Sequence, residues 1–148
     1  MLANILKDSY NRDLNKLKLE LMAYSNQSDL WLTDKEITNS AGNLCLHLIG
    51  NLKTYIGGAL ANSNYTRNRP EEFSQINISR NQLIKQIDAV IIEINQVLDT
   101  ITTTALECDY PILVFDKKTT IAYILTHLTT HLSYHTGQIN YHRRLLSS

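Results

Sequence analysis

Apolar residues recur at intervals of three and four along four separate stretches of this chain, and this spacing restricts the possible folds most strongly. Residues so spaced share one face of an α-helix, which must be buried against another element. The predicted helices run from Leu2 to Tyr24, from the cap residue Ser40 to just before Asn62, from the cap residue Ser79 to Ile101, and from Thr119 or Thr120 to Leu146. We therefore predict an all-α fold, a four-helix bundle that forms a single domain over residues 1–148.

The connections between these helices carry three further expectations. Trp31 lies between the first two helices and is expected to insert into the core. The third helix is expected to end at Thr102–Thr104, because threonine is a poor helix former. Residues 108–118 contain the only strand-like run, Tyr110 to Phe115, which predicts a short extended excursion before the last helix. Five glycines and two prolines are too few for a turn-rich all-β fold.

The charge balance restricts the partners of the protein. Fourteen Lys and Arg residues match fourteen Asp and Glu residues, so the chain lacks the basic excess typical of nucleic-acid binding or of a polybasic membrane anchor. No apolar run approaches the roughly 20 residues of a membrane span. The first residues lack the features of a signal peptide, and two cysteines, Cys45 and Cys108, make no disulfide framework. We expect a reduced, cytoplasmic protein without a nucleic-acid or membrane partner.

Histidine is concentrated in the last predicted helix, which holds four of the five histidines: His127, His131, His135 and His142. The first three follow one another at intervals of four residues. Such neighbours lie about 40° apart around the helix and about 6 Å apart along it, so two imidazoles can bind one cation. The spacing by itself allows the pair His127 and His131 as well as the pair His131 and His135.

The positions of His135 and His47 strengthen the metal hypothesis. His135 replaces an aliphatic residue on the stripe of Leu128, Leu132 and Ile139, and a buried imidazole needs partners for both nitrogens. A metal and an outer hydrogen bond supply both. His47 lies at the border of the apolar stripe on the second helix, from which it can reach the pair inside a bundle. Three histidines with an open fourth position are typical of a catalytic site, whereas structural zinc sites are closed.

The runs around these histidines resemble those of the DinB/YfiT-like superfamily. The run His131-Leu-Ser-Tyr-His135-Thr-Gly137-Gln138 resembles its His-x-x-x-His-x-Gly-Gln signature, and His47-Leu48-Ile49-Gly50-Asn51-Leu52 resembles its second-helix motif. An uncharacterised bacterial subfamily also has an Arg-x-Arg-x-Glu-Phe-like stretch, which Arg67 to Phe73 matches. The resemblance covers nearly the whole chain. Many relatives have Arg after the last histidine; this chain has Thr136, so a role of that Arg does not carry over.

The resemblance implies an up-down-down-up bundle in which His47, His131 and His135 bind a divalent metal, zinc or nickel, and it implies homodimers. Characterised relatives include thiol-dependent transferases and isomerases. A metal-dependent transferase or hydrolase acting on a small thiol or an electrophile is therefore the favoured function. The alternatives are a metal-binding or interaction bundle without turnover, and a plain bundle whose histidines bind nothing.

Four further residues are candidates for the surroundings of this metal. Gly137 and Gln138 favour the later histidine pair, so His127 is expected outside the ligand set, near the metal or at the surface. Asn51 and Gln138 are candidates to bind a ligand imidazole or a metal-bound water. Tyr134 is a candidate proton donor to a substrate, although tyrosines at helical spacing are more often core residues.

Other polar residues have structural interpretations. Arg67 and Arg69 are able to hold an anionic substrate, but pairing with Glu71 or Glu72 to close the loop is favoured. His142, with Arg143 and Arg144, is expected near the helix end, where a cation suits the helix dipole. Cys45 is expected in the core. Gly50 and Gly137 weaken their helices, which close packing or room near the metal would explain.

Overall fold

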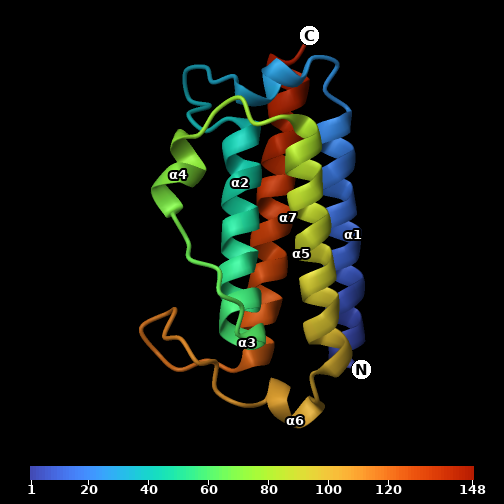
Figure 1. Cartoon of the computed structure of the whole chain (residues 1–148), viewed down its shortest axis with the longest axis vertical. Helices are drawn as coiled ribbons and strands as arrows, with labels where there is room; N and C mark the ends of the chain where they lie inside the picture. Colours follow the sequence, from blue (N-terminus) through green and yellow to red (C-terminus); the bar gives the residue numbers. More distant parts are fainter.

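Four long helices form the body of the molecule (Figure 1). The computed structural model describes residues 1–148, and the four helices are α1 (Leu2–Met22), α2 (Ala41–Leu52), α5 (Arg80–Thr100) and α7 (Ile121–Leu146). Helix α1 packs against α5 and α7, and α2 packs against the same two helices. No strand is present. The prediction of an all-α helical bundle is confirmed.

Three of the long helices begin at a side chain that caps the backbone. The hydroxyls of Ser40, Ser79 and Thr120 each accept a backbone N–H from the residue three positions further on. At Ser79 the Gln82 side chain accepts the Ser79 N–H in return, which completes a capping box. These caps satisfy N–H groups that the helix itself leaves free, so the predicted starts are confirmed, with Thr120 rather than Thr119 as the last cap.

The second predicted helix is continuous but changes its winding. After α2 the backbone forms a π-helix, η2 (Lys53–Gly58), and then one more turn, α3 (Ala59–Ala61). It ends at Asn62, which has a left-handed φ of 52°. Asparagine tolerates this conformation, which is a common way to terminate a helix.

Three short helices were not expected from the periodicity. They are η1 (Gln27–Trp31), α4 (Arg69–Ser74) and α6 (Thr103–Leu106). Helix α5 does end before the threonines, as predicted, but the Thr102 hydroxyl then accepts the Ala105 N–H and begins α6. Inside a helix a threonine side chain competes with the backbone for hydrogen bonds, which is unfavourable. At the cap position the same side chain accepts a backbone N–H that would otherwise be free, which is favourable.

A single core of 28 buried apolar residues joins the helices. Cys45 is fully buried in it, as predicted. Trp31 does not enter the core fully: it is half-buried at the edge, and Leu30 is the residue that η1 buries. The Trp31 ring lies over Gly42, where a Cβ would come within 2.5 Å of it. The flat ring needs this glycine to approach α2, and a large indole is rarely enclosed on all sides.

The connection between α6 and α7 forms a loop rather than a strand. One isolated bridge closes it, in which the Tyr110 N–H donates to the Thr119 carbonyl at 2.8 Å and the Ile121 N–H donates to the Cys108 carbonyl at 2.9 Å. The Tyr110 hydroxyl also donates to the Tyr55 carbonyl. The strand-like run has no neighbouring strand to pair with, so the expected excursion is present without regular β-structure.

The segment between α3 and α5 returns along the outside of the bundle and carries α4 beside α2 (Figure 1). The N-terminus and α6 lie at one end of the bundle, and the C-terminus lies at the other. None of the helices combines the length and the apolar character that crossing a membrane requires.

Candidate metal centre

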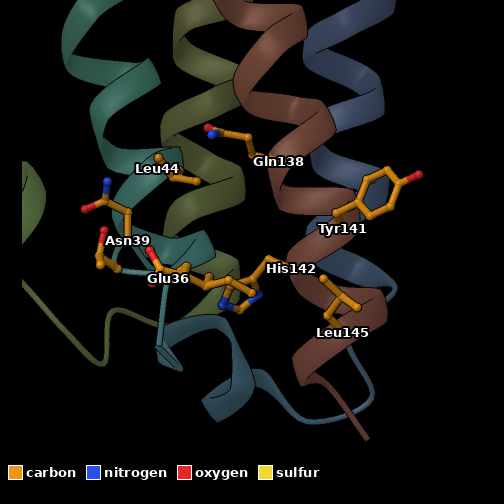
Figure 2. Close-up of a pocket in the computed structure, with 9 residues that line it drawn as sticks. Glu36, Asn39, Leu44, Gln138, Tyr141, His142 and Leu145 are labelled. Atoms are coloured by element: carbon orange, nitrogen blue, oxygen red, sulfur yellow. The ribbon is translucent and has the colours of Figure 1, made fainter. Parts of the chain in front are cut away.

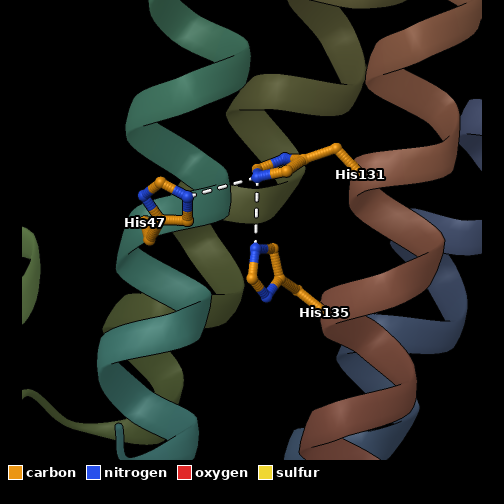
Figure 3. Close-up of side chains that lie close together, drawn as sticks. All are labelled: His47, His131 and His135. Atoms are coloured by element: carbon orange, nitrogen blue, oxygen red, sulfur yellow. Dashed lines mark hydrogen bonds between the residues drawn. The ribbon is translucent and has the colours of Figure 1, made fainter.

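Three histidines from two helices meet between α2 and α7 (Figure 3); His47 is buried, whereas His131 and His135 are half-buried. His47 lies on α2, and His131 and His135 lie one turn apart on α7. The Nε2 atom of His131 is 3.3 Å from Nε2 of His47 and 3.1 Å from Nε2 of His135. One nitrogen of each ring lies within 4.8 Å of the other two. The structure thus brings together the three residues that the sequence indicated.

These separations suit a shared cation. Two nitrogens bound tetrahedrally to one zinc ion at about 2.0–2.1 Å are about 3.3 Å apart. The two short distances between the imidazoles therefore match those of neighbouring ligands on one metal. Little movement of the rings is needed to bind a divalent ion between them.

The outer nitrogen of His47 is held by a buried carboxylate. His47 Nδ1 lies 3.0 Å from Oε1 of Glu72. An ionised carboxylate only accepts hydrogen bonds, so this contact places the ring hydrogen on Nδ1 and turns the Nε2 lone pair toward the other histidines. Arg67 donates to both oxygens of the same carboxylate, at 2.8 and 2.9 Å. Glu72 is only 4% exposed, and this fork compensates its charge.

The outer nitrogen of His135 is held by the next polar residue on its helix face. His135 Nδ1 lies 2.6 Å from the side-chain oxygen of Gln138. That oxygen accepts, so the His135 hydrogen is also on Nδ1 and its Nε2 presents a lone pair. The sequence identified Gln138 as a candidate partner of a ligand imidazole, and the structure places it in that contact.

His131 stands between these two lone pairs. Its Nε2 can donate a hydrogen to only one of them, and its Nδ1 is buried without a hydrogen-bond partner. A cation at the meeting point would accept a lone pair from all three Nε2 atoms. This set of donors therefore fits a divalent metal better than it fits a hydrogen-bonded cluster of imidazoles.

Removal from water lowers the pKa of two of the three rings. Burial, helped by the neighbouring His135 and His47, lowers the pKa of His131 to about 4. Burial also lowers the pKa of His47, although the Glu72 hydrogen bond opposes this effect. A neutral imidazole is the form that binds metal, so protons compete weakly for these two ligands.

Helix α2 holds α4, and with it Glu72, in place. The side-chain N–H₂ of Asn43 donates to the backbone carbonyls of Glu72 at 2.9 Å and Gln75 at 2.7 Å. A Cβ on Gly50 would lie only 1.9 Å from Glu72 Oε2, so Gly50 leaves the space that the carboxylate occupies. A Cβ on Gly137, in contrast, would meet no atom within 4 Å. The need for space beside the centre therefore explains the glycine at position 50 but not the glycine at position 137.

Sequence reasoning missed the contact of Glu72 with His47 and the role of Asn43. It did favour a loop-closing pair of Arg67 with Glu71 or Glu72, and Arg67 pairs with Glu72. One signal pointed to the missed contact: a ligand histidine needs an outer acceptor, and the stretch from Arg67 to Phe73 offers two carboxylates. Nothing local showed which one reaches α2.

The remaining candidates lie around the centre without joining it. Asn51 is 7% exposed, and its Oδ1 is buried without a partner. His127 is exposed, contacts the Phe115 ring edge-on, and is not one of the converging three. Tyr134 is 65% exposed beside the His135 ring, so it lies outside the core.

His142 lies near the end of α7, as predicted, but it is buried among other elements. It is 3% exposed. Its Nε2 donates to the Leu32 carbonyl at 2.8 Å, and its Nδ1 lies 2.7 Å from the Tyr24 hydroxyl, which also contacts the Ile139 carbonyl at 3.3 Å. Both ring nitrogens have partners inside the fold, so the imidazole joins α7 to the end of the first helical segment and to the loop after η1.

Several cavities lie along α7, and two of them are lined by the histidines or by Gln138. One, of about 340 Å³, is lined by His47 and His131 of the centre. The other, of about 250 Å³, lies toward the end of α7 and is lined by Gln138 and His142 among others, with none of the three converging histidines (Figure 2). Of these two cavities, only the first borders the cluster of three histidines.

Comparison with known proteins agrees with this fold. The structure is similar to the crystal structure of a conserved protein from Enterococcus faecalis, with a TM-score of 0.79 and 18% sequence identity over 97% of this chain and 95% of that chain. No curated protein gives a match. Residues 5–148 match a family described as protein of unknown function (DUF1572), and the chain belongs to that family.

Proposed function

We propose that this protein binds one divalent cation through His47, His131 and His135 and uses the open coordination position for a metal-dependent transfer or hydrolysis. The observation that supports this most is the convergence of three ring nitrogens within 4.8 Å. The outer hydrogen bonds to Glu72 and Gln138 support it further, because they turn two lone pairs inward.

The donor set indicates the class of chemistry. When bound, zinc or nickel held by three neutral imidazoles keeps a position for water or thiol and favours the deprotonated nucleophile. The residues of the chain then have separate tasks: Glu72 and Gln138 orient two ligand rings, and Ile124 and Leu128 of α7 form an apolar wall of the cavity beside them. A small thiol or an electrophile is the proposed substrate. The cavity that opens on His47 and His131 favours this catalytic function over a purely structural metal.

Membership of the DinB/YfiT-like superfamily is part of the proposal. The two histidine motifs support it, as does the course of the chain in Figure 1, where α1 and α7 run toward one end of the bundle and α2 and α5 run toward the other. This course agrees with the up-down-down-up order that the resemblance implies.

A homodimer is also proposed. Every residue of α2 is buried within the chain, so its wide apolar surface is covered by α4 and the bundle and is not free for pairing. The exposed apolar side chains that support pairing lie on α1 and α5, among them Ile5, Leu19 and Ile92. Light scattering at micromolar concentration tests this, and a mass near 17 kDa would count against a dimer.

Metal analysis of protein purified without a histidine tag tests the central proposal. We expect about one zinc or nickel ion per chain, which His131→Ala or His135→Ala largely removes. His127→Ala is the matched control on the same helix and should keep its metal. A thiol and electrophile activity screen of the loaded protein follows. Failure to bind zinc, nickel or cobalt after reconstitution would overturn the proposal, and equal loss in all three variants would show that the ligand pair on α7 is wrongly chosen.

A further inference from the structure

We propose that the cavity beside His47 and His131 binds a small organic carboxylate and that Arg69 is the residue that binds its carboxylate group. The inference rests on the proposed function for the role of this ligand as a substrate, but the binding itself depends on residues outside the metal centre. The proposal combines an unpaired guanidinium, an unpaired buried amide and an apolar wall around one space.

The cavity has the size and lining of a small-molecule site. Its volume is about 340 Å³, which is at the lower end for ligand pockets. One side is apolar and the other carries a few polar groups. The apolar side comprises Val114, Ile124 and Leu128. This division suits a ligand with a short carbon chain and a polar end.

Only one of the two arginines that line the cavity has an uncompensated charge. Arg67 donates its fork to Glu72, which neutralises it. Arg69 is exposed and makes no ion pair or side-chain hydrogen bond; its guanidinium lies 5.6 Å from the centre of the Phe73 ring. The stacked ring restrains the guanidinium without using its five N–H donors. The cavity therefore offers a free, oriented cation.

Phe73 connects this cation to the histidines. Its ring centre is 5.0 Å from that of His47, so the ring that contacts Arg69 also contacts a proposed metal ligand. A ligand of a few carbons can then reach from Arg69 toward the open side of the metal. Because Glu72 compensates Arg67, the metal and Arg69 supply the positive charge at the cavity, which favours an anion.

The number of free donors favours a carboxylate over a phosphate. A guanidinium fork matches the two oxygens of one carboxylate. A phosphate dianion has more charge and three acceptor oxygens, and Arg69 is the only unpaired side-chain cation of the chain that lines the cavity, because Arg67 is already paired. Asn51 adds a further requirement, because it lines the same cavity and its buried Oδ1 has no partner. Buried polar atoms without partners are rare, so a ligand hydroxyl or amine between the two ends would satisfy it.

The test is a titration of the full chain with hexanoate, hexanamide and inorganic phosphate, followed by amide chemical shifts in NMR. It is performed on both zinc-loaded and metal-free protein, whose metal content is measured on the same samples. We expect hexanoate to bind at the cavity at least about tenfold more tightly than hexanamide, since a charge-assisted bond to Arg69 is lost in the amide. Phosphate should bind more weakly than hexanoate.

Two variants make the result specific. Arg69→Gln should weaken hexanoate binding at least about tenfold. Arg144→Gln is the matched control, because Arg144 is also exposed and also stacked on an aromatic ring, that of Tyr141 at 4.8 Å, but does not line the cavity. Equal binding by the two variants, equal binding of hexanoate and hexanamide, or tighter binding of phosphate would overturn the inference.

The outcomes also separate this inference from the proposed function. Chains that bind zinc at the histidines but bind hexanoate independently of Arg69 would refute the carboxylate site alone. If the protein binds no metal but its hexanoate affinity falls in Arg69→Gln, the metal function is refuted and the carboxylate site is supported.

Discussion

The Glu72 carboxylate accepts the Nδ1 hydrogen of His47 at 3.0 Å, although the two residues lie on different helices and 25 positions apart. This contact decides which nitrogen of His47 faces the other two histidines. The short helix α4 is thus part of the proposed metal centre without supplying a ligand to it.

Replacing Glu72 by glutamine should weaken metal binding about 10–100-fold, the usual effect of losing an outer partner of a ligand histidine. The amide removes the charge that Arg67 and His47 share. Competition with a chromophoric chelator measures the affinity. The matched control is Glu71→Gln, on the exposed side of the same helix. Equal affinities of the two variants would show that Glu72 only closes the loop.

Adding a methyl group at Gly50 should disturb the same contact from the other side. The new Cβ would lie 1.9 Å from Glu72 Oε2, so Gly50→Ala must displace a carboxylate that two partners hold. We expect a loss of about 1–3 kcal/mol in the free energy of unfolding, as for other overpacked sites. Urea unfolding of the metal-free protein measures it.

Gly137→Ala is the control for this prediction. Its Cβ would meet no atom within 4 Å, so the substitution should raise stability by up to about 1 kcal/mol through helix propensity. A stabilised Gly50→Ala protein with unchanged metal affinity would contradict the steric explanation.

The metal-free protein should lose stability as the pH falls from about 6.5. The pKa of His131 is lowered to about 4 in the folded chain, whereas an unfolded histidine titrates near about 6.5. Between these values the unfolded state binds more protons, so stability increases with pH in this window and the contribution is complete above it. Denaturant unfolding at pH 5 and pH 7 measures the change.

His131→Gln is the comparison for this pH dependence. It removes the titrating ring but keeps a polar side chain, so its stability should change less between pH 5 and pH 7 than that of the parent protein. NMR of the imidazole nitrogens adds a direct reading, in which the His131 ring stays neutral at pH 6. A His131 ring that protonates near its ordinary pKa would refute the effect of burial.

Removal of the metal should lower the melting temperature without unfolding the protein. We expect the core of 28 buried apolar residues to hold the fold without the cation, unlike the small core of a zinc finger. A ligand at a hundredfold excess over its Kd stabilises by about 2.7 kcal/mol, which corresponds to roughly 5–10 °C for a domain of this size. Circular dichroism before and after chelation measures this. An unfolded metal-free chain would favour a structural metal, and an unchanged melt would mean that no metal is bound.

The parts of the fold that follow from local chemistry were predictable. Apolar spacing defined the long helices, and Ser40, Ser79 and Thr120 marked their starts, because capping depends on residues only three positions apart. The meeting of His131 with His135 is equally local, since it needs only one helical turn. His47 required the further premise that α2 packs against α7.

What the sequence left open depends on distant contacts. The docking of α4 is decided by the Asn43 side chain and by the space above Gly50, neither of which has a periodic signature. The burial of His142 was missed for the same reason: its partners, Tyr24 and the Leu32 carbonyl, come from the far end of the sequence. The position of a histidine near a helix end does not by itself show which distant elements pack on its ring.

Because Arg69 and Glu72 lie on the same short helix, α4, ligand binding at one affects the other. The six residues of this helix include both Glu72, which orients a proposed metal ligand, and Arg69, which lines the cavity. A carboxylate that stabilised the present position of Arg69 would stabilise that of Glu72 as well, and with it the inward lone pair of His47. The two binding events would then be linked, and by reciprocity the metal would raise the affinity for the carboxylate by the same factor as the carboxylate raises the affinity for the metal.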